Sequence, residues 1–435
     1  MIPSRALFLV ALLAACRAGP PTPGAAPAPA LPAPGAAPSD TTCRLASGPS
    51  PAKRDTVAVA LAEGIDPTHA PLPRNDAERF VFAALYETLI RVDCVGRVLP
   101  GLAQSWEASA DRWTFTLRDD ARFWDGAPVT ARDVVAAWRA RDSTLAQSVT
   151  VLSDRTIAVR PPVAPVQPLA DPALAVTKRA PGGDWPIGTG GHWVSETDAA
   201  GVLSAVPVRR GGLPALRIST VPAGRTRDAL DEGSDVVITG DPAVLEYAGT
   251  RPGYVDVPLD WNRTYVLLAP GHPASLPDIQ RESLRDAVHL DARPAEWTGD
   301  QFWLAQLRAC GLPTARDTAP SAPRRQRVVY DQSDRNAADL AARLVGLGAL
   351  GNRSTATGLA PAAFTAALRA GGDAAYVLPL RRRVFDVCRA ALELPPWSWT
   401  ATVEPLLDVR PHALVRRGLP PLQLDWDGTP RISPR

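Results

Sequence analysis

The sequence lacks most of the signatures that mark hydrolases, metalloproteins and membrane-spanning chains. It contains no Gly-x-Ser-x-Gly, no His-Glu-x-x-His, no Cys-x-x-Cys and no Cys/His spacing typical of a metal site. No apolar run approaches the roughly 20 residues that a transmembrane helix needs. Lysine occurs only at Lys53 and Lys178, and the net charge of +2 gives no reason to expect nucleic acid as a partner. We therefore expect no catalytic residues, no metal and no cofactor.

The N-terminal segment has the pattern of a secretory signal. Arg5 supplies a positive charge, and residues 6–15 form an apolar run that is too short to span a bilayer. The run ends in Leu-Ala-Ala-Cys at 13–16, which resembles the bacterial lipobox, whose cysteine receives a diacylglyceryl group. We expect residues 1–15 to be removed and Cys16 to carry a lipid that holds the protein on a membrane. The alternative is an ordinary signal peptide with a chance cysteine.

Proline, alanine and glycine dominate the stretch that follows, residues 17–54. Such a composition buries too little apolar surface to offset the entropy of ordering, and proline-rich chains tend to extended polyproline II. We therefore expect residues 16–54 to be the lipidated cysteine and a spacer, with the globular part starting near Asp55.

Hydrophobic periodicity then predicts regular elements. The alternating run at 56–61 predicts a strand, and apolar residues at helical spacing predict a helix over 77–90. Thr130 and Asp133 have the spacing of a capping box and predict the start of a second helix. Residues 149–151 and 156–160 are expected to form a hairpin.

Five short motifs follow one another within residues 84–140. They are Tyr-Glu-Thr-Leu at 86–89, Pro-Gly-Leu-Ala-Gln-Ser-Trp at 100–106, Trp-Thr-Phe-Thr-Leu-Arg at 113–118, Phe-Trp-Asp-Gly at 123–126 and Thr-Ala-Arg-Asp-Val-Val at 130–135. This succession resembles the signature region of the family 5 extracellular solute-binding proteins, which include the dipeptide-, oligopeptide- and nickel-binding proteins of ABC importers. Pro-Ile-Gly-Thr-Gly-Gly at 186–191 resembles the family's Gly-Thr-Gly-Pro turn.

The resemblance implies an α/β fold of the two-lobed, periplasmic-binding-protein-like kind. It would be type II, of the large class with an extra subdomain in the first lobe, and its ligand cleft would lie between the lobes. The first lobe would comprise 55–265 and 405–435, and the second lobe, shortened relative to the family, 266–404. The implied function is that of a monomeric, lipid-anchored extracytoplasmic protein that delivers a small molecule or peptide to an ABC permease.

The resemblance weakens where peptide-binding members carry a Trp-x-x-Asp segment with an aspartate that pairs with the α-amino group. Here the corresponding residues read Pro-Leu-Arg-Arg-Arg-Val-Phe-Asp at 379–386, so that aspartate has no clear counterpart. Arg381 and Arg383 are candidates to bind an anionic ligand, because guanidinium groups match carboxylates and phosphates. The alternative is a solvated charge run at a strand end.

Aromatic residues are the other candidates for a ligand wall. Trp397 and Trp399 would point the same way if their segment were extended, and Tyr376 ends the preceding strand. Core packing is the alternative role for these three side chains.

After Cys16, four cysteines remain, an even number in an oxidising compartment. Cys310–Cys388 is the preferred disulfide because both residues fall in the expected second lobe, and Cys43–Cys94 would then tie the spacer to the first lobe. Spacing alone does not settle the pairing. A second function also stays open: a trimmed, non-transport relative that acts as an interaction or structural lipoprotein, which a cleft filled by side chains would favour.

Overall fold

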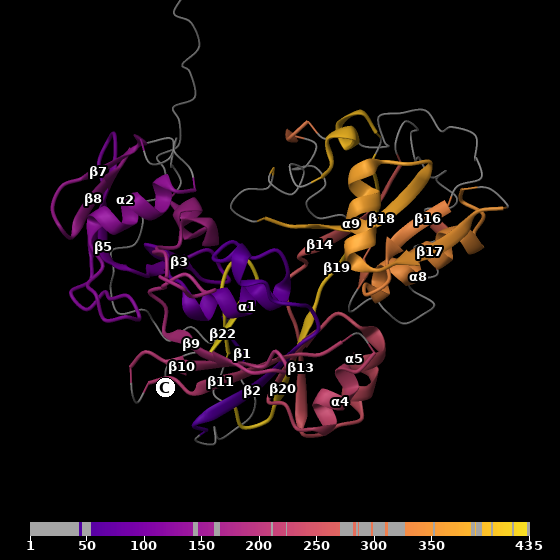
Figure 1. The fold of residues 1–435 in the computed structure, drawn as a ribbon, viewed down its shortest axis with the longest axis horizontal. Coiled ribbons are helices and arrows are strands. Elements are labelled where there is room, and N and C mark those ends of the chain that lie inside the picture. Colours follow the sequence, from indigo (N-terminus) through magenta and orange to yellow (C-terminus); the bar gives the residue numbers. More distant parts are fainter. Residues whose placement is uncertain are drawn as a thin grey trace, which may run out of the picture.

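The computed structural model describes residues 43–45, 54–141, 147–160, 166–209, 212–222, 224–269, 282–283, 286, 297–298, 309–311, 327–350, 353–383, 388, 394–401, 403–419 and 422–432. Expected features elsewhere, among them Cys16 and the spacer before residue 43, lie outside these residues. Three larger sheets carry the fold, one at the bottom of Figure 1, one at upper left and one at upper right.

A seven-stranded mixed sheet forms the base of the first lobe. In order across the sheet its strands are β13 (Tyr254–Pro258), β20 (His412–Arg416), β12 (Val236–Thr239), β2 (Thr56–Leu61), β11 (Ala215–Thr220), β10 (Leu203–Pro207) and β9 (His192–Thr197). The central strand β2 is the predicted one, and it runs parallel to both neighbours, β11 and β12. Val57, Val59, Ala60 and Leu61 are buried, as expected for a strand covered on both faces.

Helix α1 (Asp76–Leu85) covers one face of this sheet, and α4 (Thr226–Asp231) and α5 (Pro242–Gly249) cover the other. The side chain of Asn75 caps α1 by accepting from the amide of Glu78. The helix is shorter than the predicted 77–90, because the 186–191 turn packs against its last carbonyl groups. A Cβ atom on Gly188 would lie 2.2 Å from the carbonyl oxygen of Leu85, so this turn needs glycine.

The extra subdomain inserts between β2 and β9. Its antiparallel sheet has the order β5 (Ala103–Ala108), β6 (Trp113–Leu117), β8 (Thr156–Val159) and β7 (Val149–Val151). Helix α2 (Ala131–Arg139) starts with the predicted capping box between Thr130 and Asp133, and it buries Trp138 against the sheet. The short pair β3 (Ile90–Val92) and β4 (Val98–Pro100) joins this subdomain to the rest of the first lobe.

The second lobe is built on a six-stranded sheet. Its strands in order are β15 (Trp297–Thr298), β19 (Val403–Val409), β14 (Arg263–Leu268), β18 (Ala374–Arg381), β16 (Arg327–Asp331) and β17 (Thr355–Leu359). Helices α8 (Arg335–Gly346) and α9 (Pro361–Ala370) pack on its two faces. Short 3-10 helices complete the described elements, η2 (Pro67–His69), η3 (Gln167–Ala170), η4 (Pro172–Leu174) and η6 (Pro396–Thr400).

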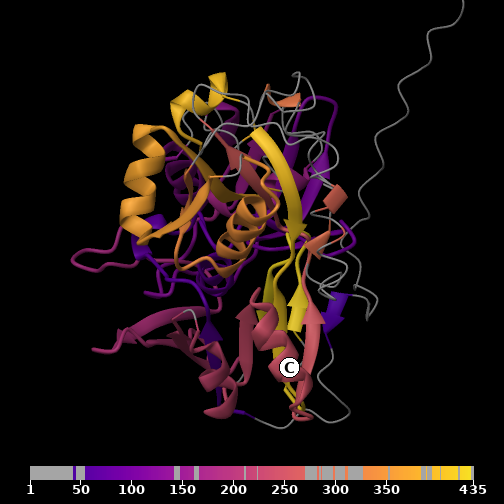
Figure 2. The same ribbon diagram turned by 90° about the vertical axis from the view of Figure 1, so that its right-hand side faces the viewer.

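The chain crosses between the lobes at 259–262 and returns at 410–411. β14 pairs with β18 and β19 from Arg263 onwards, and β19 stays in the second sheet through Val409 before β20 joins the first. Figure 2 shows these yellow C-terminal strands running from the upper sheet into the lower one. The paired strands of the second sheet run from Arg263 in β14 to Val409 in β19, and so extend a little past both limits of the expected 266–404.

A three-stranded sheet joins residues 44–45 to the C-terminal strands of the first lobe. β1 (Arg44–Leu45) pairs with β21 (Leu422–Leu424), which pairs with β22 (Pro430–Ile432). A disulfide joins Cys43 to Cys94. The end of the expected spacer is thus part of the folded first lobe. A second disulfide joins Cys310 to Cys388.

Candidate functional site

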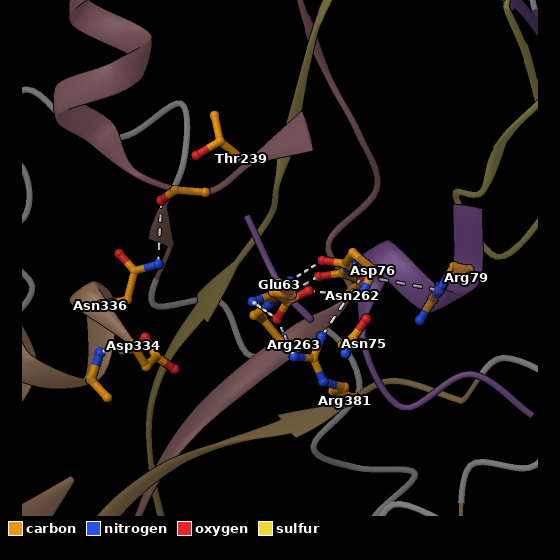
Figure 3. A network of polar contacts seen from close by, with 12 residues as sticks. Glu63, Asn75, Asp76, Arg79, Thr239, Asn262, Arg263, Asp334, Asn336 and Arg381 are labelled. Atoms are coloured by element: carbon orange, nitrogen blue, oxygen red, sulfur yellow. Dashed lines mark hydrogen bonds and ion pairs between the residues drawn. The ribbon is translucent and has the colours of Figure 1, made fainter. Parts of the chain in front are cut away.

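Charged residues from both lobes meet beside the two crossings. Glu63 follows β2 and Asp76 begins α1 in the first lobe, Asn262 lies in the first crossing, and Arg263 and Arg381 belong to the second-lobe strands β14 and β18. We call these five residues the interlobe cluster (Figure 3). Such side chains reach one another only because the carboxyl end of β2 and the start of α1 face the strand ends of the other lobe.

The cluster is held by direct ion pairs. Arg263 Nη2 contacts Asp76 Oδ2, and Arg381 Nη2 lies 2.6 Å from Glu63 Oε1. The amide of Asn262 donates to Asp76 Oδ1 at 2.8 Å. Two weaker contacts cross over, from Arg263 to Glu63 at 3.9 Å and from Arg381 to Asp76 at 3.8 Å. The guanidinium and carboxylate groups therefore form a network rather than two separate pairs.

Burial makes this network sensitive to any change of charge. Asp76 and Arg263 are both buried. Burial alone would raise the pKa of Asp76, but the guanidinium groups of Arg263 and Arg381 outweigh this effect and lower it to about 2. Burial would likewise lower the pKa of Arg263, whereas Asp76 and Glu63 raise it above its usual value. Asp76, Arg263 and Arg381 are thus ionised at neutral pH.

A second polar group lies at the start of α8. The hydroxyl of Tyr265 donates to both carboxylate oxygens of Asp334, at 2.9 and 2.8 Å, and Asp334 also caps α8 by accepting from the amide of Ala337. Asn336 donates to the carbonyl oxygen of Gly240 at 3.3 Å, which is a contact from the second lobe to the first. Figure 3 shows Asp334 and Asn336 set apart from the interlobe cluster.

Asp334 differs from the acids of the interlobe cluster in its partners. Burial raises the pKa of its carboxyl group, yet its side chain is only half-buried by accessible surface. Within the part of the chain that the structure describes, no guanidinium group lies within ion-pair distance of Asp334. This carboxylate, together with the amide of Asn336, could orient a polar solute at the boundary between the lobes.

The predicted arginines lie at this boundary, but they contact the protein's own groups. Arg381 pairs with Glu63, as described above. Arg383 donates to the carbonyl oxygen of Pro73 at 2.6 Å, and the intervening Arg382 lies 3.3 Å from Asp260. Successive arginines at the end of β18 therefore link the second lobe to three segments of the first.

The three predicted aromatic residues do not form a common ligand wall. Tyr376 is buried in the second-lobe core, where its hydroxyl donates to a carbonyl of α9 and its ring packs on that of Trp397. The indole of Trp397 donates to the carbonyl oxygen of Leu368, also on α9. Trp399 is 37% exposed. Because η6 is a 3-10 helix rather than an extended segment, the condition under which Trp397 and Trp399 would point the same way is not met.

Sequence reasoning missed Glu63, Asp76, Arg263 and Asp334. One signal was present for Glu63, because ligands of α/β sheets gather at the carboxyl ends of parallel strands and Glu63 follows such a strand. Among the described residues, no three His, Cys, Asp or Glu side chains are placed to hold a metal ion. No helix in that part of the chain is long and apolar enough to cross a membrane.

Comparison with known proteins adds sequence and structural relatives. Residues 97–190 match the family model of bacterial extracellular solute-binding proteins, family 5 Middle. The periplasmic murein peptide-binding protein MppA of Escherichia coli (strain K12) is 45% identical over 60 residues, which are 14% of this chain and 11% of MppA. The nickel-binding periplasmic protein of the same strain is 35% identical over 91 residues, 20% of this chain and 17% of that protein.

The sequence matches thus span less than a fifth of the length of these curated relatives, whereas the structural match is extensive. The solved structure of the Escherichia coli murein tripeptide binding protein MppA superimposes with a TM-score of 0.60 and 15% identity, covering 88% of this chain and all of that one. This likeness shows the two-lobed fold. The family model and the sequence relatives add a likeness to family 5 of the bacterial extracellular solute-binding proteins over residues 97–190 and the neighbouring matched segments.

Proposed function

We propose that this protein is an extracytoplasmic solute-binding protein that captures a small solute, peptide-like or other, between its lobes and delivers it to an ABC permease. The observation that carries the proposal is the polar boundary between the two lobes in a chain whose residues 97–190 match the family 5 model. Asp334 and Asn336 supply a carboxylate and an amide there, beside the first-lobe carbonyl of Gly240. Relatives named for binding murein peptide and nickel support a soluble cargo of modest size.

We further propose that the mature chain begins at a lipidated Cys16. The apolar run before this residue and the proline-rich stretch after it support a tethered protein. Because β1 and the Cys43–Cys94 disulfide fasten the chain to the first lobe, the tether would act through that lobe and leave the second lobe free to move. Metabolic labelling with a radioactive fatty acid tests this, since a Cys16→Ser variant should lose the label.

A thermal-shift screen tests the solute-binding role. The Cys16→Ser protein would be melted with peptides, amino acids, sugars, metal ions and anionic metabolites, because a ligand that binds only the folded state raises the melting temperature as its concentration rises. A hit would be repeated with Asp334→Asn, which keeps a good N-cap for α8 but removes the charge. A loss of affinity there, with none in Asp133→Asn of the α2 cap, places the solute between the lobes.

One observation favours the other function, an interaction or structural lipoprotein. The interlobe cluster joins the lobes through the chain's own ion pairs, so part of the boundary is already occupied by side chains. A flat response to the whole panel from a cooperatively folding sample would favour that role.

A further inference from the structure

A cavity of about 250 Å³ lies within the first lobe, away from the boundary between the lobes. It is partly open and is lined by α1, the segment after it, the starts of β9 and β11, and the C-terminal strands β21 and β22. Residues that line it and bear on its chemistry are Phe80, Ala83, Leu216, Glu87, Arg91 and Arg431. Each of these belongs to the first lobe, so opening or closing of the lobes leaves the cavity intact.

The size and walls of the cavity suit a small, partly apolar molecule. Phe80 and Leu216 are buried and present apolar surface, and the short side chain of Ala83 leaves the space open. The volume falls below the range of about 300–1,000 Å³ that holds drug-sized ligands. An occupant with a single ring or a short alkyl chain would therefore fit, whereas an oligopeptide would not.

The charges around the cavity leave a positive excess. Arg91 lies 2.8 Å from Asp425 Oδ1, and Arg431 contacts the other oxygen of the same carboxylate. Burial would raise the pKa of Asp425, but these two guanidinium groups lower it, so the carboxylate is ionised. The remaining wall acid, Glu87, is bound by Arg118 at 2.8 Å. Two guanidinium groups thus share the carboxylate of Asp425, and Asp427 and Glu87 also act on Arg431.

Arg91 also has a hydrogen-bond donor without an acceptor. Its Nε is buried and has no hydrogen-bond acceptor among the described residues. An unpaired buried donor is costly, and a guanidinium group binds carboxylates in a fork. That nitrogen has no surface open to the cavity, but the Arg91 side chain as a whole is 24% exposed and lines the cavity, so an anionic group beside it would improve the charge balance.

We propose that this cavity is a binding site for a small carboxylic acid with an apolar body, whose carboxylate pairs with Arg91. The site is independent of solute capture between the lobes. A ligand there would also contact β21, the strand on which β1 pairs and through which the N-terminal segment is fastened.

Isothermal titration of the Cys16→Ser protein with phenylacetate, and with 2-phenylethylamine as the cationic counterpart, tests the proposal. Phenylacetate should bind saturably with a dissociation constant on the order of 1 mM, as expected for about ten non-hydrogen atoms. The amine should not bind. Arg91→Gln should weaken phenylacetate binding at least about tenfold, the effect of losing a charge-assisted hydrogen bond.

Ala83→Trp fills the cavity and should abolish binding. Ala136→Trp, on the exposed face of α2, adds the same side chain elsewhere and should leave binding unchanged. Equal binding of acid and amine, no saturable binding of phenylacetate, or full binding by Ala83→Trp would each overturn the proposal. If Ala83→Trp fails to fold, the comparison of acid with amine and the Arg91→Gln variant decide it.

Discussion

Replacing Asp76 by asparagine should destabilise the protein more than the loss of one isolated ion pair would, because Asp76 lies in a network of arginines. The substitution keeps the shape of the side chain and its contact with Asn262, but it removes the negative charge that faces Arg263 and Arg381. The lowered pKa of Asp76, about 2 against its usual 3.8, corresponds to about 2 kcal/mol in favour of the ionised form. The variant also leaves the buried guanidinium groups of Arg263 and Arg381 with fewer acidic partners, which costs further stability. We therefore expect the free energy of unfolding to fall by about 3 kcal/mol.

Urea unfolding, followed by both circular dichroism and tryptophan fluorescence, measures this loss. The matched control is Asp111→Asn, whose partner Arg112 lies 3.3 Å away in an exposed pair, and it should cost less than about 1 kcal/mol. The pH dependence has a defined sign: because folding lowers the pKa of Asp76, its stabilisation is complete above pH 3.8 and declines toward pH 2. The difference between wild type and Asp76→Asn should shrink over that range.

A loss below about 1 kcal/mol for Asp76→Asn would refute this reasoning, because it would mean that the cluster's desolvation cost cancels its attraction. Adding Arg263→Met provides a further check. The double variant should lose at least about 1 kcal/mol less than the sum of the two single losses, since groups in one network are coupled.

Three further changes have expected outcomes. Tyr376→Phe should cost about 1 kcal/mol in urea unfolding, because it removes a buried hydrogen bond to α9. Gly188→Ala should cost more than about 2 kcal/mol or prevent folding, because its Cβ would overlap a carbonyl at the end of α1, whereas Gly212→Ala meets nothing within 4 Å and should be tolerated. Burial lowers the pKa of His192, so stability should fall as the pH drops below about 6.5, and His192→Gln should lessen that fall between about pH 8 and pH 5.5.

The parts of the fold that sequence predicts well are those fixed by neighbouring residues. The capping box of Thr130 and Asp133 forms within one turn, and β2 has the predicted bounds because its apolar pattern needs only a covered sheet. The predicted end of α1 was wrong because a segment about a hundred residues later, the turn that contains Gly188, packs on its last carbonyls. The hydrophobic pattern of residues 77–90 does not indicate that contact.

The candidate site is harder to predict for the same reason. Asp76 and Arg263 are 187 residues apart in sequence, and Glu63 and Arg381 are 318 apart. The run of arginines at 381–383 was identified from its charge, but charge alone does not distinguish a ligand-binding group from one that pairs with the protein's own acids. For Trp397 the sequence left a ligand wall and core packing open, and its partners, the ring of Tyr376 and the carbonyl of Leu368, are fixed only by the packing of α9.

The position of the interlobe cluster bears on how the lobes could move. Arg263 and Asn262 lie at the crossing itself, where a hinge motion changes the distances between the two lobes least. The interlobe cluster would therefore persist in open and closed forms and serve as a pivot. The contact of Asn336 with Gly240 lies apart from the pivot and would have to break on opening, at a cost of about 1 kcal/mol for one hydrogen bond. A solute that gains only a few kilocalories from contacting both lobes would therefore suffice to shift the population toward the closed form.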